Sequence, residues 1–173
     1  MSFATRVSKT TKPATPSDTF EAEELLPAPI EKVFGFFSRA ENLELLTPPF
    51  LHFKILSPTP APMHSGTRIE YRIRLHGIPM KWVTEITCWE PGVRFVDVQL
   101  SGPFRLWRHE HRFEAVGDST RMLDHLTYSI PGSIFAPLAN ALFVRRQIRA
   151  IFAYRSAAIR RVFQSSAMRS SKG

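Results

Sequence analysis

The feature that constrains the fold most is the spacing of the apolar residues, which changes from the period of a helix to that of a strand and then back again. Between residues 50 and 130 apolar and polar residues alternate, which is the period of a β-strand with one buried face. From about Phe135 to Phe163 apolar residues recur every three or four positions, which is the period of a helix. A sheet with one apolar face needs a cover, and this helix is the one segment long enough to provide it. The pattern predicts an α+β domain.

Turn residues divide the alternating region into strands that follow one another as hairpins. The expected strands are Phe50–Leu56, Thr67–Leu75, Met80–Trp89, Val93–Leu100, Phe104–Ala115 and Arg121–Ile130, with a turn at His76–Pro79 between the second and third. A further strand is expected at Thr19–Leu26, followed by a helix opened by Pro29 and a short helix near Asn42–Leu46. We therefore expect a curved antiparallel sheet of about seven strands around a long C-terminal helix, with two short helices after the first strand.

One domain is expected at residues 19–164. Residues 1–18 are rich in Ser, Thr, Lys and Pro and lack the apolar core of a secretory signal, so a disordered N-terminal tail is expected, and residues 165–173 are expected to be a C-terminal tail. Cys88 is the sole cysteine, which rules out an intrachain disulfide, and we expect a cytoplasmic protein. The uncharged run 126–144 is interrupted by proline and glycine and is not expected to span a membrane.

The formal net charge of +8 leaves polyanion binding open, because charge alone indicates only non-specific attraction. No recognition helix, Gly-rich phosphate loop or aromatic RNA-binding motif accompanies it, so no specific nucleic-acid partner is expected. The basic residues Arg145, Arg146 and Arg149 follow an apolar segment that contains Ile134 and Phe135. Transient contact of this region with an anionic membrane is one hypothesis, and an ordinary solvated helix face is the alternative.

The hairpin turns allow an approximate cross-strand register for the inner face of the sheet. One row contains Tyr71, Thr84, Asp97, Trp107 and Tyr128, the next Ile69, Ile86, Phe95, His109 and Leu126, and the third Cys88, Val93, His111 and Asp124. An interior that should be apolar thus contains two His, two Asp, two Tyr and a Thr, most of which are costly to bury without partners. This polar cluster is the main indication of function.

The stretch from Trp107 to Phe113 places both His109 and His111 on the inner face. We expect Asp124 to orient His111, and His109 or Asp97 to present a polar group to a ligand held among aromatic walls. The residues expected to bind the ligand are Tyr71, Trp82, Thr84, Phe95, Asp97, Trp107, His109, His111, Asp124, Tyr128, Ile148 and Phe152.

Other interpretations of the cluster remain open. A His–Asp hydrogen bond that only fixes the strand register is one. General acid–base catalysis is another, with His109, His111, Asp97 and Asp124 as candidate catalytic residues. A metal could use both histidines and one Asp, but residues i and i+2 of a strand stand roughly 7 Å apart, so no metal or cofactor is expected. Cys88 is expected to be a buried, inert thiol beside Ile86.

The opposite face of the sheet also carries apolar residues, namely Trp89, Val96, Val98, Leu100 and Leu106. Either the assumed register is wrong there or these residues form a patch for self-association, which makes a homodimer one hypothesis.

Two stretches resemble a known group of proteins. Leu26-Pro27-Ala28-Pro29-Ile30-Glu31-Lys32-Val33-Phe34 and the order of elements resemble the START-like (SRPBCC, helix-grip) superfamily, and the polyketide cyclase/dehydrase-like branch in particular. The stretch Gly102–Phe113, with the pattern GPFxxWxHEHxF, looks like a bacterial ligand-binding subgroup of that superfamily.

The resemblance implies a helix-grip fold with a deep hydrophobic cavity between the sheet and the C-terminal helix. Members bind lipids, sterols, polyketides or quinones, and some branches catalyse reactions. The expected function is binding or carriage of a hydrophobic small molecule. The alternatives are a cyclase or dehydratase that uses a His/Asp pair of the pocket, and a protein-interaction module whose cavity is closed. The resemblance assigns no catalytic role to His109 or His111.

Overall fold

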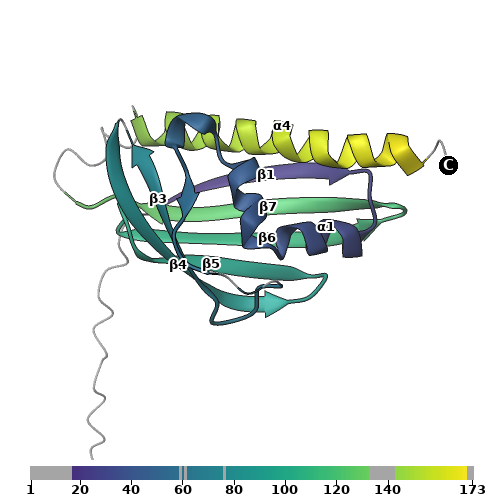
Figure 1. Cartoon of the computed structure of the whole chain (residues 1–173), viewed down its shortest axis with the longest axis horizontal. Helices are drawn as coiled ribbons and strands as arrows, with labels where there is room; N and C mark the ends of the chain where they lie inside the picture. Colours follow the sequence, from purple (N-terminus) through teal and green to yellow (C-terminus); the bar gives the residue numbers. More distant parts are fainter. Residues whose placement is uncertain (1–16, 59, 61, 76, 133–142, 171–173) are drawn as a thin grey trace, which may run out of the picture.

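One seven-stranded antiparallel sheet and a long helix that lies along it make up most of the computed structural model (Figure 1). The structure describes residues 17–58, 60, 62–75, 77–132 and 143–170. The strands are β1 (Asp18–Leu26), β2 (Lys54–Ile55), β3 (Arg68–Leu75), β4 (Ile78–Glu90), β5 (Arg94–Ser101), β6 (Leu106–Val116) and β7 (Ser119–Ser129). They lie in the order β1-β7-β6-β5-β4-β3-β2, and every neighbouring pair is antiparallel.

The helices are α1 (Ile30–Phe37), α2 (Leu43–Leu46) and α4 (Arg145–Ser170), with the 3-10 turns η1 (Ala40–Asn42) and η2 (Pro49–Leu51) beside α2. Figure 1 shows the ends of β3 and β4 curving up toward the beginning of α4, while α1 lies over the other end of the sheet. The predicted architecture, a curved antiparallel sheet around a C-terminal helix with short helices after the first strand, is confirmed.

Several element boundaries differ from the prediction, most of all at β2 and at the end of α4. Phe50 and Leu51 belong to η2 and not to a strand, because Pro49 supplies the fixed φ that suits the first position of a helical turn. Helix α4 continues to Ser170, so part of the predicted C-terminal tail is helical, since residues 164–170 contain no proline or glycine that would end the helix. The predicted beginning of this helix near Phe135 lies outside the described residues.

Helix α1 closes one end of the space between the sheet and α4. Its apolar spacing places Val33, Phe34 and Phe37 on one buried face. The ring of Phe34 lies 5.1 Å from that of Trp89 and 5.3 Å from that of Phe113, measured between ring centroids. This end of the molecule is therefore filled by aromatic side chains, which leaves the other end as the place for a cavity.

The predicted register is confirmed between β6 and β7, where His109 lies opposite Leu126 and His111 opposite Asp124. It is wrong at the three preceding strand pairs. The prediction paired Tyr71 with Thr84, Thr84 with Asp97, Asp97 with Trp107 and Phe95 with His109. The observed pairs are Tyr71 with Trp82, Ile86 with Asp97, Asp97 with His109 and Phe95 with His111.

The connections between strands explain two of these differences. The turn predicted at His76–Pro79 is tighter than expected, because β4 begins at Ile78, and Gly77 takes the positive φ of 82° that a tight hairpin favours. In the connection between β5 and β6, the side chain of Gln99 accepts a hydrogen bond from the backbone N–H of Phe104 and donates one to the carbonyl of Phe104. Phe104 is thereby held in the loop and does not begin the strand.

The third difference begins at the turn between β4 and β5, which is tighter than predicted because Glu90 lies opposite Arg94, and a β-bulge in β4 then shifts the pairing by one residue. Ile86 lies opposite Asp97 and Cys88 lies opposite Val96, so Thr87 is an extra residue on β4. Beyond the bulge the two faces of the strand exchange, and this turns Trp89 inward onto Phe34.

Three apolar residues lie elsewhere than predicted, two of them because of the bulge and Val93 because of the turn. Cys88 does not lie on the inner face beside Ile86, because its Sγ atom contacts Glu90 on the outer face, at 3.5 Å from Oε1. Val93 lies in the turn before β5 and is 53% exposed. Trp89 is no part of an outer apolar patch, and homodimer formation through that face stays a prediction.

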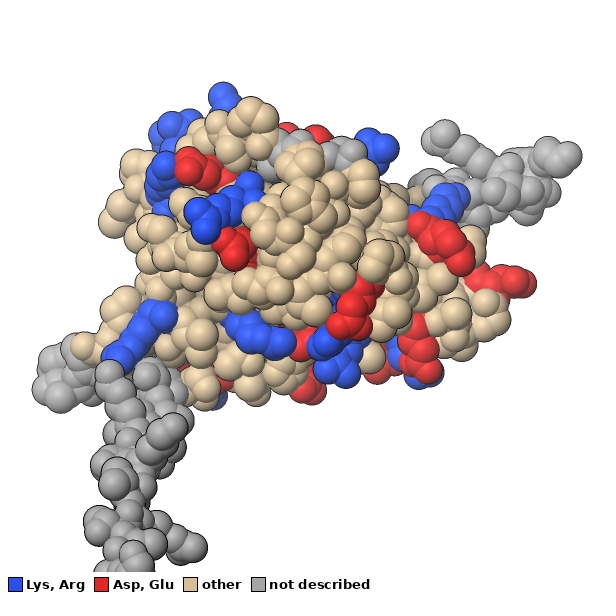
Figure 2. Space-filling view, turned by 90° about the horizontal axis from the view of Figure 1, so that it is seen from below, with Lys and Arg blue, Asp and Glu red and all other residues tan. Residues whose placement is uncertain are grey.

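Within the described part of the chain, no helix has the length and apolar character needed to cross a membrane. The face of the molecule shown in Figure 2 carries Lys and Arg interspersed with Asp and Glu, with no single basic patch. Arg145, Arg146 and Arg149 are exposed on α4, and membrane contact by this region stays a prediction. Ile134 and Phe135 lie outside the described residues.

Candidate functional site

A cavity of about 200 Å³ lies between the sheet, the segment around α2, and α4. For comparison, an apolar cavity of about 150 Å³ in another protein holds benzene. The present cavity therefore has room for a small ring system or for part of a longer ligand. Its apolar walls are formed by Phe37, Leu43, Leu46, Leu51, Phe53, Met63, Ile69, Tyr71, Ile73, Leu75, Trp82, Ile86, Phe95, Phe104, Trp107, Val144, Ile148, Ile151 and Phe152.

The residues that the sequence predicted to bind a ligand are mostly found together at this cavity. Tyr71, Trp82, Thr84, Phe95, Asp97, Trp107, His109, His111, Ile148 and Phe152 all line it. Two do not. Asp124 is buried behind the histidines, and Tyr128 is buried under Phe104, with ring centroids 6.0 Å apart. Neither side chain lines the cavity, and a direct contact of either with a ligand stays a prediction.

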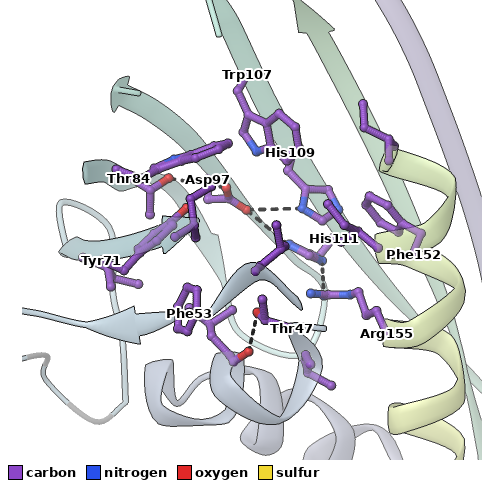
Figure 3. A pocket seen from close by; sticks show the side chains of 18 of the residues that line it. Thr47, Phe53, Tyr71, Thr84, Asp97, Trp107, His109, His111, Phe152 and Arg155 are labelled. Atoms are coloured by element: carbon purple, nitrogen blue, oxygen red, sulfur yellow. Dashed lines mark hydrogen bonds and ion pairs between the residues drawn. The ribbon is translucent and has the colours of Figure 1, made fainter. Parts of the chain in front are cut away.

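Asp97, His109 and His111 meet at one wall of the cavity (Figure 3), and Asp124 is buried behind the two histidines. Oδ2 of Asp97 lies 3.6 Å from Nδ1 of His109 and 3.3 Å from Nε2 of His111. Oδ1 of Asp124 lies 3.1 Å from Nε2 of His109 and 2.6 Å from Nδ1 of His111. Each imidazole thus lies between the same two carboxylates, and the ring centroids of the two histidines are 3.8 Å apart. The expected contact of Asp124 with His111 is present.

Arg155 of α4 is a further member of this cluster that sequence reasoning missed. It is only 9% exposed, its Nε atom lies 3.5 Å from Oδ2 of Asp124, and its Nη2 atom lies 3.3 Å from Nδ1 of His111. The guanidinium also lies over the ring of Phe37. A signal was available in the sequence: Arg155 stands in line with Ile148, Phe152 and Ile159, at a position where a helix facing a core should carry an apolar residue.

Burial and neighbouring charges shift the pKa values of the four groups in different directions. Burial tends to raise the pKa of Asp124, but the charges of Arg155 and His111 outweigh it and hold this pKa well below its ordinary value. Burial likewise opposes ionisation of Asp97, yet its hydrogen bond with His111 and the charge of His109 keep the pKa of Asp97 low. Both carboxyl groups are therefore carboxylates at neutral pH.

The two histidines differ from each other. Burial lowers the pKa of His109, and the neighbouring charge of His111 lowers it further. Burial also acts to lower the pKa of His111, but the charge and hydrogen bond of Asp124 more than compensate and raise it. Two imidazoles that touch cannot easily carry a charge each, so the second stays neutral when the first is charged.

The polar wall continues along the sheet toward Tyr71. The hydroxyl of Thr84 donates to the carbonyl of Val98 at 3.1 Å and lies 3.5 Å from Oδ1 of Asp97. Burial, with the nearby charge of Asp97, raises the pKa of Tyr71 well above its ordinary value, so Tyr71 keeps its proton. The buried indole N–H of Trp82 has no hydrogen-bond partner within the part of the chain that the structure describes.

Comparisons with known proteins agree with this architecture. The model of the family described as polyketide cyclase/dehydrase and lipid transport matches residues 26–153. No curated protein matches the chain. A crystal structure of a protein from Thermus thermophilus is similar to the chain with a TM-score of 0.64 and 22% identity, covering 86% of this chain and 99% of that one.

Two further solved structures share the fold at lower identity. The ZhuI aromatase/cyclase of Streptomyces sp. R1128 has a TM-score of 0.61 and 15% identity, covering 85% of this chain and 96% of that chain. A START superfamily protein of Mycobacterium smegmatis has a TM-score of 0.65 and 13% identity, covering 85% of this chain and 97% of that one. The family match spans more than half of the sequence and the fold is the helix-grip fold of these neighbours, so the chain belongs to the polyketide cyclase/dehydrase and lipid transport family.

Proposed function

We propose that the protein binds and carries a hydrophobic small molecule in the cavity between the sheet and α4. The observation that carries this proposal is the composition of the walls, which are mainly aromatic and aliphatic, with the Asp97, His109 and His111 cluster on the sheet and a few further polar side chains, Arg39, Asn42, Thr47 and Gln147, on the helical side. Ligand pockets commonly combine such apolar lining with a few placed polar groups. The description of the family, which names lipid transport beside polyketide cyclase and dehydrase, supports the same class of ligand.

The walls also favour a particular shape and chemistry of ligand. Trp82, Trp107 and Phe104 form a group of rings with centroids 4.7 to 5.6 Å apart, which suits a flat or ring-containing ligand. A quinone or an aromatic polyketide offers such a ring system, and a lipid offers apolar surface to the same walls.

The test begins with the protein as its host makes it. Native mass spectrometry of protein purified from its own host should reveal a bound small molecule, and thermal-shift assays with lipids, quinones and aromatic polyketides should raise the midpoint of unfolding. Repeated recovery of empty protein, with no thermal shift from any of these compounds, would overturn the proposal.

A matched pair of variants on α4 tests whether the ligand binds inside the cavity. Ile151 lines the cavity, so Ile151→Trp should occupy part of it and abolish the ligand-induced thermal shift. Ala150 is exposed on the same helix turn, so Ala150→Trp adds the same side chain outside the cavity and should leave the shift unchanged. Equal loss of the shift in both variants, or in neither, would place the ligand elsewhere.

A second candidate function is that of a cyclase or dehydratase, and it is favoured by the position of Asp97, His109 and His111 at the wall. A dehydratase of this kind would convert a β-hydroxy carbonyl compound into the enone and water. Incubation with linear poly-β-ketones and with β-hydroxy carbonyl compounds, followed by analysis of the products, would test it. If the His109→Ala and His111→Ala variants both turned over a confirmed substrate at the full rate, the assignment of catalysis to these histidines would be wrong.

A further inference from the structure

Three ligand atoms of Asp97, His109 and His111 converge at the cavity wall. One atom from each side chain lies within 4.8 Å of the other two. In a tetrahedral zinc site with bonds of about 2.0–2.1 Å, neighbouring ligand atoms are about 3.3 Å apart. The distances from Oδ2 of Asp97, 3.6 Å to Nδ1 of His109 and 3.3 Å to Nε2 of His111, are already close to that spacing.

The pairing of the strands produces this convergence. Along a strand, side chains at i and i+2 are roughly 7 Å apart, which argues against two neighbouring histidines on one ion. In the structure, however, the two rings turn toward each other until their centroids are 3.8 Å apart. Asp97 lies directly opposite His109 on β5 and so completes the set from the adjacent strand.

The remaining nitrogen of each imidazole is held by Asp124. Its Oδ1 atom lies 3.1 Å from Nε2 of His109 and 2.6 Å from Nδ1 of His111. Both carboxylates can only accept hydrogen bonds, and Nε2 of His111 also lies within hydrogen-bond distance of Oδ2 of Asp97, at 3.3 Å. A metal ion at this place would displace the proton that the two groups share, because metal binding to histidine releases protons.

Asp124 gives both rings the hydrogen-bond partner that metal-binding histidines require. Such histidines almost always donate the other ring N–H to a carboxylate or carbonyl, which fixes the tautomer and the orientation of the ring. Asp124 provides this contact for both rings, and Arg155 in turn pairs with Asp124. With neutral imidazoles, two carboxylates and one guanidinium leave the cluster with a net negative charge, which favours a divalent cation.

We infer that Asp97, His109 and His111 bind one divalent first-row transition-metal ion at the wall of the cavity. Two imidazoles and a carboxylate suit Zn²⁺, Fe²⁺, Co²⁺ or Ni²⁺, whereas Mg²⁺ and Ca²⁺ require a shell made almost entirely of oxygen. Three protein ligands leave a coordination position open, as in catalytic metal sites. All three residues line the cavity, so an oxygen of a bound hydrophobic ligand would reach that position. The inference goes beyond the proposed function and does not depend on it.

Titration of untagged, full-length protein with Co²⁺ at neutral pH tests the inference. We expect saturation at one ion per chain, a visible absorption band from Co²⁺ bound by histidine, displacement of Co²⁺ by Zn²⁺, and no competition from Mg²⁺. Asp124→Asn should weaken binding by about 10- to 100-fold, because the carboxylate that orients both metal-binding rings is lost. Asp97→Asn, His109→Gln and His111→Gln should each weaken it more than Asp124→Asn does.

His125→Ala is the matched control. His125 is exposed on the outer face of β7 beside Glu21, where an adventitious ion would bind, and its loss should leave the affinity unchanged. Circular dichroism of each variant shows whether weaker metal binding comes from the loss of a metal-binding side chain or from unfolding of the protein.

The titration of the wild-type protein tests the inference even if a variant fails to fold. If the wild-type protein binds neither Co²⁺ nor Zn²⁺ saturably, or if Asp97→Asn binds as tightly as wild type, the inference is wrong and a shared proton occupies the cluster instead. Ile151→Trp should lose the hydrophobic ligand and keep the metal, so failure of this inference and failure of the proposed function are distinguishable.

Discussion

Arg155 shows how much one side chain of a helix determines at this site. It is buried in a helix face that is otherwise apolar, and it compensates the charge of Asp124, which in turn orients both histidines. A buried carboxylate that loses its partner is strongly destabilising, because the remaining charge is left without compensation.

We predict that Arg155→Met lowers the free energy of unfolding by about 3 kcal/mol or more. Arg149→Met, at an exposed position of the same helix, should change it by no more than about 0.5 kcal/mol. Chemical denaturation of both variants at neutral pH measures the difference. Equal stability of the two variants would mean that Asp124 does not depend on Arg155.

At the level of single residues, the sequence predicted which polar side chains face inward better than it predicted which of them touch. The pattern His-x-His on a strand required both imidazoles to share a face, and they do. The contacts of Asp97 with both histidines could not be predicted, because they depend on the pairing of β5 with β6, which the loop at Phe104 sets. Arg155 could have been found as the charged residue in an apolar stripe.

Between elements, α4 is attached to the edge strand β1 by polar contacts as well as by its apolar face. Glu24 accepts hydrogen bonds from Nε and Nη2 of Arg160, at 2.8 and 2.9 Å, and from the hydroxyl of Ser156. The hydrogen bond from Arg160 lowers the pKa of Glu24; burial opposes this shift but is outweighed. A carboxyl group whose pKa is lower in the folded chain stabilises the fold above its unfolded pKa, and this contribution disappears as the pH falls through the folded pKa.

We therefore predict a pH-dependent cost for Arg160→Gln. At pH 7 the variant should be less stable by up to about 1 kcal/mol, because the arginine is half-exposed and solvent screens the pair. The difference between variant and wild type should narrow as the pH falls below the ordinary Glu value of 4.5, because protonation of Glu24 then removes from the wild-type protein the interaction that the variant already lacks. Denaturation midpoints measured at several pH values provide the comparison. A difference that stays constant down to low pH would show that Arg160 acts through packing and not through charge.

The strands illustrate why elements are easier to predict than their register. Alternation and turn residues located β1 and β3 to β7, but a register error follows from any single extra residue. Thr87 is such a residue, and the bulge that contains it turns Trp89 inward and Cys88 outward. The local alternation does not mark Thr87 as an extra residue, because its neighbours Ile86 and Cys88 could each lie on either face of the sheet.

Over the whole molecule, the sheet and α4 depend on each other. The inner face of the sheet is covered by α4 and α1, and residues such as Ile159 and Phe163 of α4 belong to the same buried cluster as Ile86 and Phe95 of the sheet. Neither part can keep its apolar face out of water alone, which is the condition for cooperative, two-state unfolding.

The tryptophans allow this coupling to be measured. All three tryptophans of the chain, Trp82, Trp89 and Trp107, lie in the sheet, whereas α4 contributes most of the helical circular dichroism. We predict that tryptophan fluorescence and far-ultraviolet circular dichroism report the same denaturation midpoint. Phe163→Ala, at the far end of α4 and fully buried, should lower stability by about 3–5 kcal/mol and move both transitions together, because a cavity in the helix interface weakens the sheet equally. A helix signal lost before the fluorescence change would show that α4 detaches from an intact sheet.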